Sequence, residues 1–233
     1  MAATATAIDD AVHARADIEL VGNLCEAQVV TGVPRGPFGL CQRRVRARVF
    51  GEPPFACELV PTDIAPARPH VFAYAAWRPM REAAVAGGVD PADLAIHSAY
   101  RSVALQAEVW AYRLAERRRM REAAGLPPLA ERDLARLQMK WTAKPGQSAH
   151  HTGFALDLGL YRHGKRGAKE APAYRWLAAH ARRFGFYPYL PEGWHWEYNP
   201  PGLVPQLAAL RAALEAGREP GDLWKIPEPM PVA

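Results

Sequence analysis

Apolar residues recur along the chain with two periods, and each period predicts one kind of element. A spacing of three or four residues is typical of an amphipathic helix, and strict alternation is typical of a half-buried strand. The first period predicts helices over residues 77–86, 103–124, 131–140, 172–184 and 203–214. The second predicts strands over residues 43–50 and 94–100. The largely apolar residues 152–158 predict a buried strand, and residues 193–198 a further strand.

Capping residues and prolines set the predicted helix ends. Ser102 is a suitable N-cap for the longest helix, and Gly125 stops it. Its predicted apolar face consists of Val103, Ala107, Trp110 and Leu114. Helical signals begin around Val71, but Pro79 is tolerated only in a first helical turn, so the helix before the longest one is predicted over residues 77–86.

The order of these elements predicts the fold class. Strands and helices alternate irregularly, and no glycine-rich phosphate loop follows a first strand. This order favours an α+β fold, a central and mainly antiparallel sheet with flanking helices, over a doubly wound nucleotide-binding fold. Residues 1–17 show no clear apolar repeat and are predicted to form a frayed tail or a short helix, and residues 18–69 are β-like and rich in turns. The Pro-rich residues 219–233 predict an extended strap or a disordered tail.

Composition is that of a soluble globular protein. The chain has 233 residues, 49% hydrophobic and 23% charged, enough for a large domain whose core needs no disulfides. No apolar run approaches the roughly 18 residues of a membrane span. The net charge of +5 is explained more simply by a solubilising surface than by a polyanion site. Cys25, Cys41 and Cys57 form no CxxC pair, and three reduced, partly buried thiols are favoured over one disulfide with a spare thiol.

Two segments contain residues suited to a metal site. SAHHTGFALD places Asp157 in an apolar strand, where a carboxylate is costly unless paired or bound to a metal. EGWHWEY places His195 between two tryptophans, with its side chain on the opposite strand face. With His150, these residues make the two imidazoles and one carboxylate of a catalytic zinc site that keeps one open position. Glu192, three residues before His195, is placed as a general base rather than a ligand.

Other roles are open for each of these residues. A lone histidine in an apolar strand, as His195 is, more often forms hydrogen bonds within the core. Asp157 could form an ion pair with Arg101. His151 could replace His150 as the ligand, because periodicity does not distinguish neighbouring histidines.

Three motifs, in order along the chain, resemble the signatures of one enzyme family over residues 71–200. They are SxYRS with a later glutamine (Ser98, Tyr100, Arg101, Ser102, Gln106), SxHxxGxAxD (Ser148, His150, Gly153, Ala155, Asp157), and ExxH with aromatic-x-Tyr (Glu192, His195, Trp196, Tyr198). They are similar to motifs of the zinc D-alanyl-D-alanine carboxypeptidase/dipeptidase family. That family includes vancomycin-resistance D,D-carboxypeptidases, L,D-carboxypeptidases and several phage endolysins.

The resemblance implies a role for each matching residue. One zinc ion would be bound by His150, Asp157 and His195, and Glu192 would take the proton of the attacking water. Arg101 would bind the substrate carbonyl or terminal carboxylate, which suits its planar donor fork. Further substrate contacts are implied for Ser148, Gln106, Tyr100 and Trp194.

The chain departs from the family pattern at two positions. Many relatives have Gln where this chain has His151, and Arg where it has Glu197. Both changes are interpreted as altering the polarity of the pocket, and they bear on the substrate more than on the metal.

The predicted organisation is an N-terminal β-rich extension of unknown role over residues 1–70, a zinc peptidase domain over 71–218 and a tail over 219–233. The protein is expected to be a monomer. It is expected to hydrolyse an amide bond at a D-amino acid of peptidoglycan stem peptides, as a D-alanyl-D-alanine carboxypeptidase. The alternatives are a peptidoglycan endopeptidase, an L,D-carboxypeptidase, or a non-catalytic zinc or cell-wall-binding module.

Nucleic acid is not an expected partner. The arginines over residues 117–121 lack interleaved aromatics, and a charged helix end accounts for them. Action in the periplasm or cell wall is expected, although the N-terminal residues do not read as a secretory signal. A missing natural leader, release of a phage enzyme and specialised secretion are the three explanations.

Overall fold

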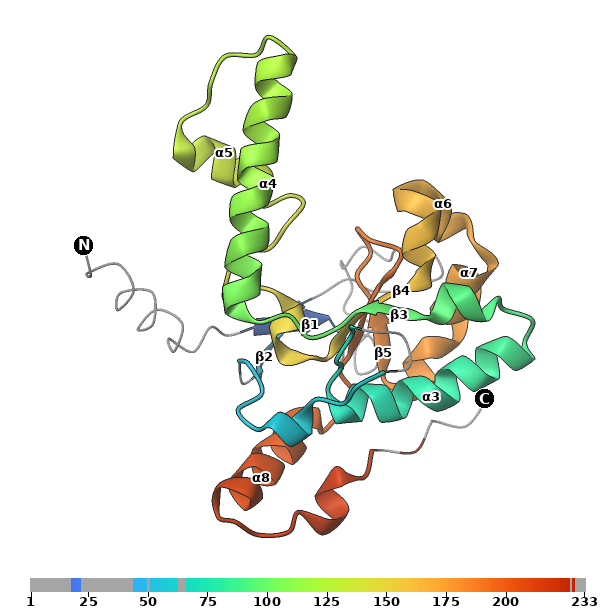
Figure 1. The fold of residues 1–233 in the computed structure, drawn as a ribbon. Coiled ribbons are helices and arrows are strands. Elements are labelled where there is room, and N and C mark those ends of the chain that lie inside the picture. Colours follow the sequence, from blue (N-terminus) through green and yellow to red (C-terminus); the bar gives the residue numbers. More distant parts are fainter. Residues whose placement is uncertain (1–17, 22–43, 50, 63–65, 227, 229–233) are drawn as a thin grey trace, which may run out of the picture.

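The computed structural model describes residues 18–21, 44–49, 51–62, 66–226 and 228 (Figure 1). Helices surround a small central sheet: α3 (Val71–Ala86), α4 (Val103–Ala123), α5 (Glu131–Gln138), α6 (Gly164–Glu170), α7 (Pro172–His180) and α8 (Leu203–Glu215). The strands of the sheet are β3 (Ile96–Ser98), β4 (Ala155–Leu158), β5 (Phe186–Pro188) and β6 (His195–Tyr198). They lie in the order β3-β4-β6-β5, and every neighbouring pair is antiparallel. The predicted α+β class is therefore confirmed.

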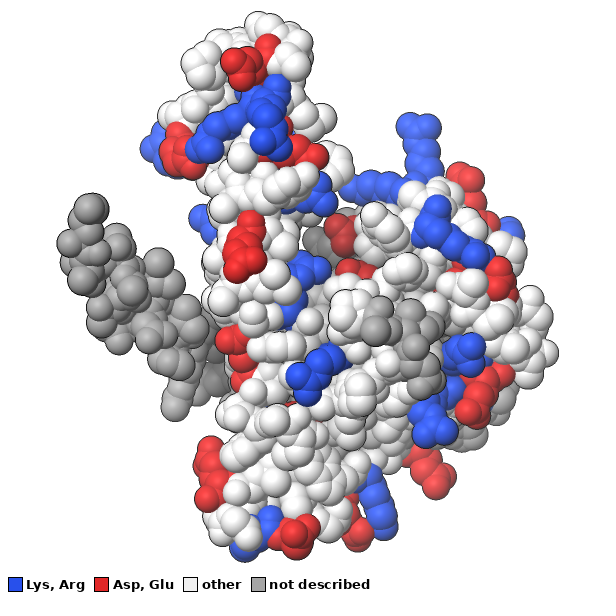
Figure 2. Space-filling model, viewed as in Figure 1, with Lys and Arg blue, Asp and Glu red and all other residues white. Residues whose placement is uncertain are grey.

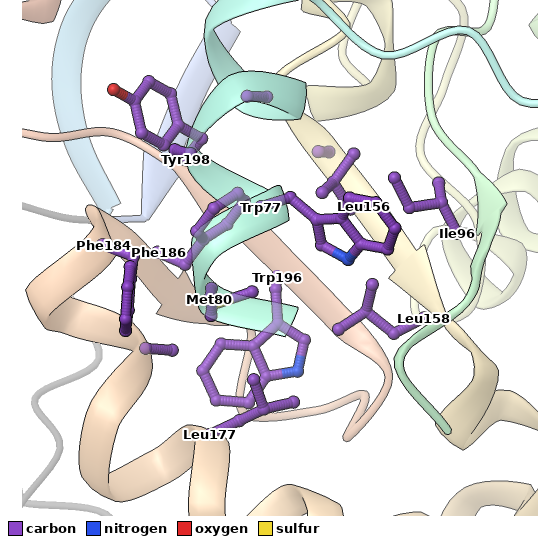
Figure 3. Close-up of a cluster of buried hydrophobic side chains, with 14 of the residues drawn as sticks. Trp77, Met80, Ile96, Leu156, Leu158, Leu177, Phe184, Phe186, Trp196 and Tyr198 are labelled. Atoms are coloured by element: carbon purple, nitrogen blue, oxygen red, sulfur yellow. The ribbon is translucent and has the colours of Figure 1, made fainter. Parts of the chain in front are cut away.

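One face of the sheet forms the core with the helices. Strand side chains alternate, so Leu156 and Leu158 of β4 point to the same face as Trp196 and Tyr198 of β6. Figure 3 shows them packed with α3, α7 and the neighbouring strands. The opposite face of the same strands is left for Asp157, His195 and Glu197, and it carries the polar chemistry described below.

Helix α3 begins earlier than its sequence predicts. It starts at Val71, and Pro79 lies inside it, so the prediction that Pro79 occupies the first turn is wrong. The His70 ring caps the helix, with Nδ1 accepting a hydrogen bond from the Phe72 N–H at 3.1 Å. The first two turns bury Phe72 against the core. This cap and burial outweigh the roughly 3 kcal/mol that an interior proline costs.

Helices α4 and α5 form an arm that projects from the body of the molecule (Figure 1). Ser102 caps α4 as predicted, accepting from the Leu105 N–H at 3.1 Å. The predicted apolar face is only partly confirmed, because Leu114 is buried while Ala107 is exposed. The arm leaves the core, so the short helix α5 covers only a narrow stripe of α4.

The remaining predicted elements differ mainly in length. The helix after Pro172 and the helix from Leu203 are confirmed, as is a strand over Arg44–Val49. The strand predicted over residues 94–100 shrinks to Ile96–Ser98, because the preceding residues form a 3-10 helix, Pro91–Leu94. Helix α6 and strand β5 are too short to show a periodic pattern and are not predicted from the sequence.

Segments on both sides of the central region pack onto it. Strand β1 (Ile18–Val21) pairs antiparallel with β2 (Arg44–Val49), and its Ile18 and Leu20 join the main core. In the predicted tail, Trp224 meets the Phe72 ring edge-on at 6.2 Å between centroids. Cys57 is a free, exposed thiol. The predictions for residues 1–17, for Cys25 and Cys41, and for the facing of the 43–50 side chains lie outside the described residues.

Candidate metal centre

The register of two strands brings a carboxylate and an imidazole together. In the antiparallel pair β4–β6, Asp157 lies directly opposite His195. Residues opposite each other on one face of a sheet have Cβ atoms about 5 Å apart. His195 Nδ1 lies 2.9 Å from Asp157 Oδ1.

A tight turn before β4 supplies the second imidazole. His150 lies in the 3-10 helix η4 (Ala149–Thr152), which Gly153 ends with a φ of 73°. A Cβ at Gly153 would lie 2.9 Å from the backbone nitrogen of His70, so both conformation and space require glycine. The turn returns the chain into β4 and leaves His150 Nε2 3.3 Å from Asp157 Oδ2.

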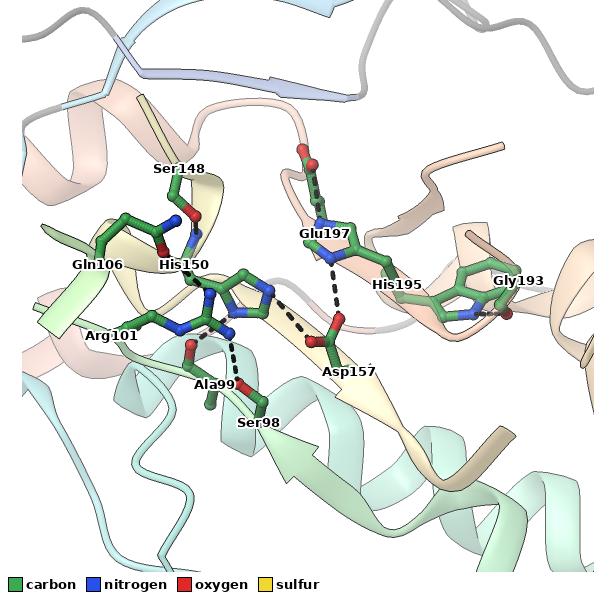
Figure 4. A network of polar contacts seen from close by, with 11 residues as sticks. Ser98, Ala99, Arg101, Gln106, Ser148, His150, Asp157, Gly193, His195 and Glu197 are labelled. Carbon is green, nitrogen blue, oxygen red and sulfur yellow. Dashed lines mark hydrogen bonds and ion pairs between the residues drawn. The ribbon is translucent and has the colours of Figure 1, made fainter. Parts of the chain in front are cut away.

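One ligand atom from each of His150, Asp157 and His195 lies within 4.8 Å of the others (Figure 4). A single cation can bridge this spread after small side-chain adjustments. Two imidazoles and one carboxylate also match the donor set of catalytic zinc. The three residues therefore fit a zinc ion and leave one position for substrate or water.

The far nitrogen of each imidazole is held by a hydrogen bond. His150 Nδ1–H donates to the Ala99 carbonyl at 2.7 Å. His195 Nε2–H donates to Glu197 Oε1 at 3.1 Å. Both rings therefore present their other nitrogen to Asp157, which is how outer contacts fix metal-binding histidines.

The three groups are electrostatically coupled. Burial raises the pKa of Asp157, but the neighbouring His150 and His195 outweigh it and hold the pKa well below its usual range. Burial lowers the pKa of His195, yet its hydrogen bonds to Asp157 and Glu197 raise it to about 10.

The structure resolves which of the adjacent histidines faces the metal position. His151 Nδ1–H donates to the Arg101 carbonyl at 2.7 Å, and its Nε2 accepts from the Gly146 N–H at 3.1 Å. Both nitrogens are engaged by backbone, and burial lowers the pKa of the ring. His151 is therefore a neutral structural residue that ties η4 to the segment preceding α4.

Arg101 lies beside His150 and is held by polar neighbours rather than by Asp157 (Figure 4). Its Nη1 donates to Gln106 Oε1 at 2.9 Å and its Nη2 to Ser98 Oγ at 3.4 Å. Gln106 is itself buried and donates to the Ala143 carbonyl at 2.7 Å. Neither partner of the guanidinium is charged, so Arg101 keeps its positive charge available for an anion.

Glu192 lies in the turn that leads into β6. The backbone N–H of His195 donates to the Glu192 carbonyl at 3.1 Å, which fixes the two residues relative to each other. The side chain is half-buried, and this burial raises its pKa. Glu192 is not one of the three residues of the metal group, and its role as the base stays a prediction. Trp194 follows it and meets the Tyr161 ring edge-on at 5.7 Å between centroids.

Two other predicted substrate contacts have partners within the protein. Ser148 Oγ accepts from the His150 N–H at 3.3 Å and so caps η4. The Tyr100 hydroxyl donates to Glu52 Oε1 at 2.8 Å. Both side chains therefore have a structural role within the fold, and contact with a substrate stays a prediction for both.

Glu197 is the residue whose role the sequence reasoning missed. It is fully buried and reaches His195 directly, so it does more than alter pocket polarity. The available signal was its position, because residues i and i+2 of a strand share one face.

A family of known enzymes matches the part of the chain that holds this site. The family model of the VanY D-alanyl-D-alanine carboxypeptidases matches residues 69–201. The chain belongs to the VanY family. It is a zinc metallopeptidase of the D,D-carboxypeptidase type, and the three-residue group provides a fitting site for the zinc cofactor. No curated protein matches the chain.

Three solved structures of carboxypeptidases and related peptidases resemble this chain in fold. The vancomycin-resistance D,D-pentapeptidase VanY of a VanB-type cassette, in complex with Zn(II), is 23% identical with a TM-score of 0.47, over 76% of this chain and 94% of that one. VanYB in complex with D-alanine-D-alanine is 23% identical with a TM-score of 0.48, over 74% and 91%. The LdcB LD-carboxypeptidase is 19% identical with a TM-score of 0.48, over 76% and 80%.

Proposed function

We propose that the protein is a zinc-dependent D,D-carboxypeptidase that releases the terminal D-alanine of peptidoglycan stem peptides. The observation that carries this proposal is the arrangement around the metal group in a VanY-family chain. Glu192 is a half-buried carboxylate in the turn just before His195. Arg101 lies beside His150, and the two side chains that accept its hydrogen bonds, Gln106 and Ser98, are neutral. A base and an anion-binding group are what hydrolysis next to a terminal carboxylate requires.

Each residue has a distinct proposed task. Zinc held by His150, Asp157 and His195 would supply a Lewis acid that polarises the scissile carbonyl and makes water more acidic. The Glu192 carboxylate takes a proton from the attacking water and passes it to the leaving amine. Its raised pKa suits this exchange, because a base that is too weak cannot accept the proton.

Arg101 binds the terminal carboxylate of the substrate in this proposal. Ser98 and Gln106 hold the guanidinium in place, so less side-chain entropy is lost when substrate binds. Ser148, Tyr100 and Trp194 complete the proposed pocket wall.

The same proposal covers organisation and location. Residues 71–218 form the peptidase domain, with an extension before it and a tail after it. Periplasm or cell wall is the proposed site of action, because the substrate is found there. Within the described residues, no helix is long and apolar enough to cross a bilayer.

A muropeptide digest tests the activity. The zinc-loaded protein should release free D-alanine from pentapeptide stems, as detected by mass spectrometry, and leave cross-links and tetrapeptides intact. Cleavage of cross-links would instead indicate an endopeptidase. Shortening of tetrapeptides would indicate an L,D-carboxypeptidase.

Glu192→Gln tests the assignment of the base. We expect kcat to fall roughly 10²–10⁴-fold, because the amide cannot accept a proton. Zinc content, measured by elemental analysis, should stay at one ion per chain. Glu215→Gln, at an exposed position of α8, is the matched control and should retain full activity. An unchanged rate for Glu192→Gln would refute the mechanism.

A further inference from the structure

A groove of about 410 Å³ lies between the arm and the candidate metal centre. We call it the arm groove. Its walls come from three places: Arg113, Glu116, Arg117 and Met120 of α4; Gln138, Trp141 and Thr142 at the end of α5; and Lys165, Glu192 and Trp194 on the body. Its volume is within the range of pockets that enclose small ligands.

Cations surround an exposed aromatic ring in this groove. Trp141 is 53% exposed, with Lys165 Nζ 4.2 Å from its ring centroid and the Arg117 guanidinium 6.0 Å from it. Arg117 Nε donates to the neutral Gln138 at 2.8 Å. Among the described residues, neither Arg117 nor Lys165 forms an ion pair with a carboxylate. Figure 2 shows further Lys and Arg side chains on the arm and over α6, on the two sides of the groove.

This arrangement favours an anionic ligand with some apolar surface. A cation that stacks on an indole keeps its charge while its stem is held in place. Of the two carboxylates in the groove walls, Glu116 is engaged by Arg113 at 2.7 Å, and Glu192 feels the charge of Lys165, which acts to lower the pKa of that carboxyl. Among the described residues, Arg117 and Lys165 are in no ion pair, so both can donate hydrogen bonds to a ligand. A carboxylate bound between them would gain charge-assisted hydrogen bonds.

The groove is continuous with the proposed active site, because Glu192 and Trp194 are among its walls. A substrate attacked beside Glu192 therefore has one part adjacent to the groove. Arg101 holds the terminal carboxylate in the proposed function, so the part that extends past Glu192 is the upstream part of the peptide. In stem peptides, the upstream residues carry carboxylates that are either free or converted to amides.

We propose that the arm groove binds the upstream part of the stem peptide and selects peptides whose upstream carboxylates are free over those in which they are amidated. This inference rests on the proposed function and adds a specificity determinant to it. Arg117 and Lys165 are the residues that make the distinction, and Trp141 supplies the apolar floor between them.

Two synthetic pentapeptides test the proposal. They end in D-alanyl-D-alanine and differ only in whether the upstream carboxylates are free or amidated, and kcat/KM for D-alanine release is measured for each. The wild type should prefer the free carboxylates by about tenfold, as expected for hydrogen bonds to a charged group. Arg117→Gln and Lys165→Gln should each bring the ratio of the two values towards one.

Arg119→Gln is the matched control, because it removes the same charge from the same helix at a position outside the groove walls. It should leave the ratio unchanged. A wild-type ratio near one would overturn the inference, as would equal losses with both peptides in the Arg117 and Lys165 variants. If the wild type released D-alanine from neither peptide, the proposed function would fail, and that outcome is distinct from loss of selectivity alone.

Discussion

Glu197 and His195 form a contact, at the scale of single residues, that the family resemblance does not predict. They lie two positions apart on β6, with Glu197 fully buried and accepting from His195 Nε2–H at 3.1 Å. A carboxylate in this position orients the imidazole and makes its other nitrogen a stronger donor to a metal. The family resemblance alone would have predicted Arg here, which cannot accept that hydrogen bond.

Glu197→Gln should weaken zinc binding about 10–100-fold, because the amide accepts a weaker hydrogen bond from the ring. Competition with a chromogenic chelator measures the dissociation constant of the purified protein. Glu192→Gln serves as the comparison and should bind zinc as the wild type does. Equal affinity of wild type and Glu197→Gln would show that the contact does not support the metal site.

At the scale of elements, the start of α4 connects the arm to the active site. Glu52 Oε1 accepts from the Val103 N–H at 2.7 Å and from the Tyr100 hydroxyl at 2.8 Å. A carboxylate at this end of a helix also interacts favourably with its dipole. Arg101 stands between the two anchored residues, so a residue of the predicted extension helps to place it.

Glu52→Ala should raise KM for the pentapeptide several-fold with a smaller change in kcat, because Arg101 loses part of its support. Ser102→Ala removes the other cap of the same helix and should cost about 1 kcal/mol of stability, with less effect on KM. Steady-state kinetics and urea unfolding measure the two effects. An equal KM for both variants would contradict the positioning role of Glu52.

On the scale of the whole molecule, a buried ion pair joins three distant parts of the chain. Glu58 is fully buried, accepts from His70 Nε2–H at 3.1 Å, and receives Arg211 Nη2–H of α8 at 2.8 Å. Burial raises the pKa of Glu58, but the hydrogen bonds from His70 and Arg211 outweigh it and hold the pKa below its ordinary value of 4.5. The segment before α3 is thereby tied to both α3 and α8.

Glu58→Gln should destabilise the fold by about 3–5 kcal/mol, since the buried ion pair with Arg211 loses its carboxylate. The wild-type contribution is complete above pH 4.5 and is lost as the pH falls through the lowered pKa of Glu58. Urea unfolding at several pH values should show this loss of unfolding free energy for the wild type. For the variant, the unfolding free energy should change less with pH. Asp222→Asn removes an exposed pair with Lys225 and should change stability by less than about 1 kcal/mol.

The sequence predicted those features that depend on local pattern. Periodicity placed most of the longer elements, and Ser102 and Gly125 marked the two ends of α4, because capping acts within a single turn. The beginning of α3 was mispredicted, because burial of its first turn outweighs the local effect of Pro79.

The sequence by itself determined the family resemblance, the fold class and two of the three candidate ligands, Asp157 and His195. Only the tertiary structure decided between His150 and His151, gave Glu197 its contact with His195, and brought Lys165 and Trp141 together beside Glu192. The physical reason is the range of the interactions. Helix periods and caps are set within a few neighbours along the chain, whereas a metal site depends on strand register and on contacts between residues far apart in sequence.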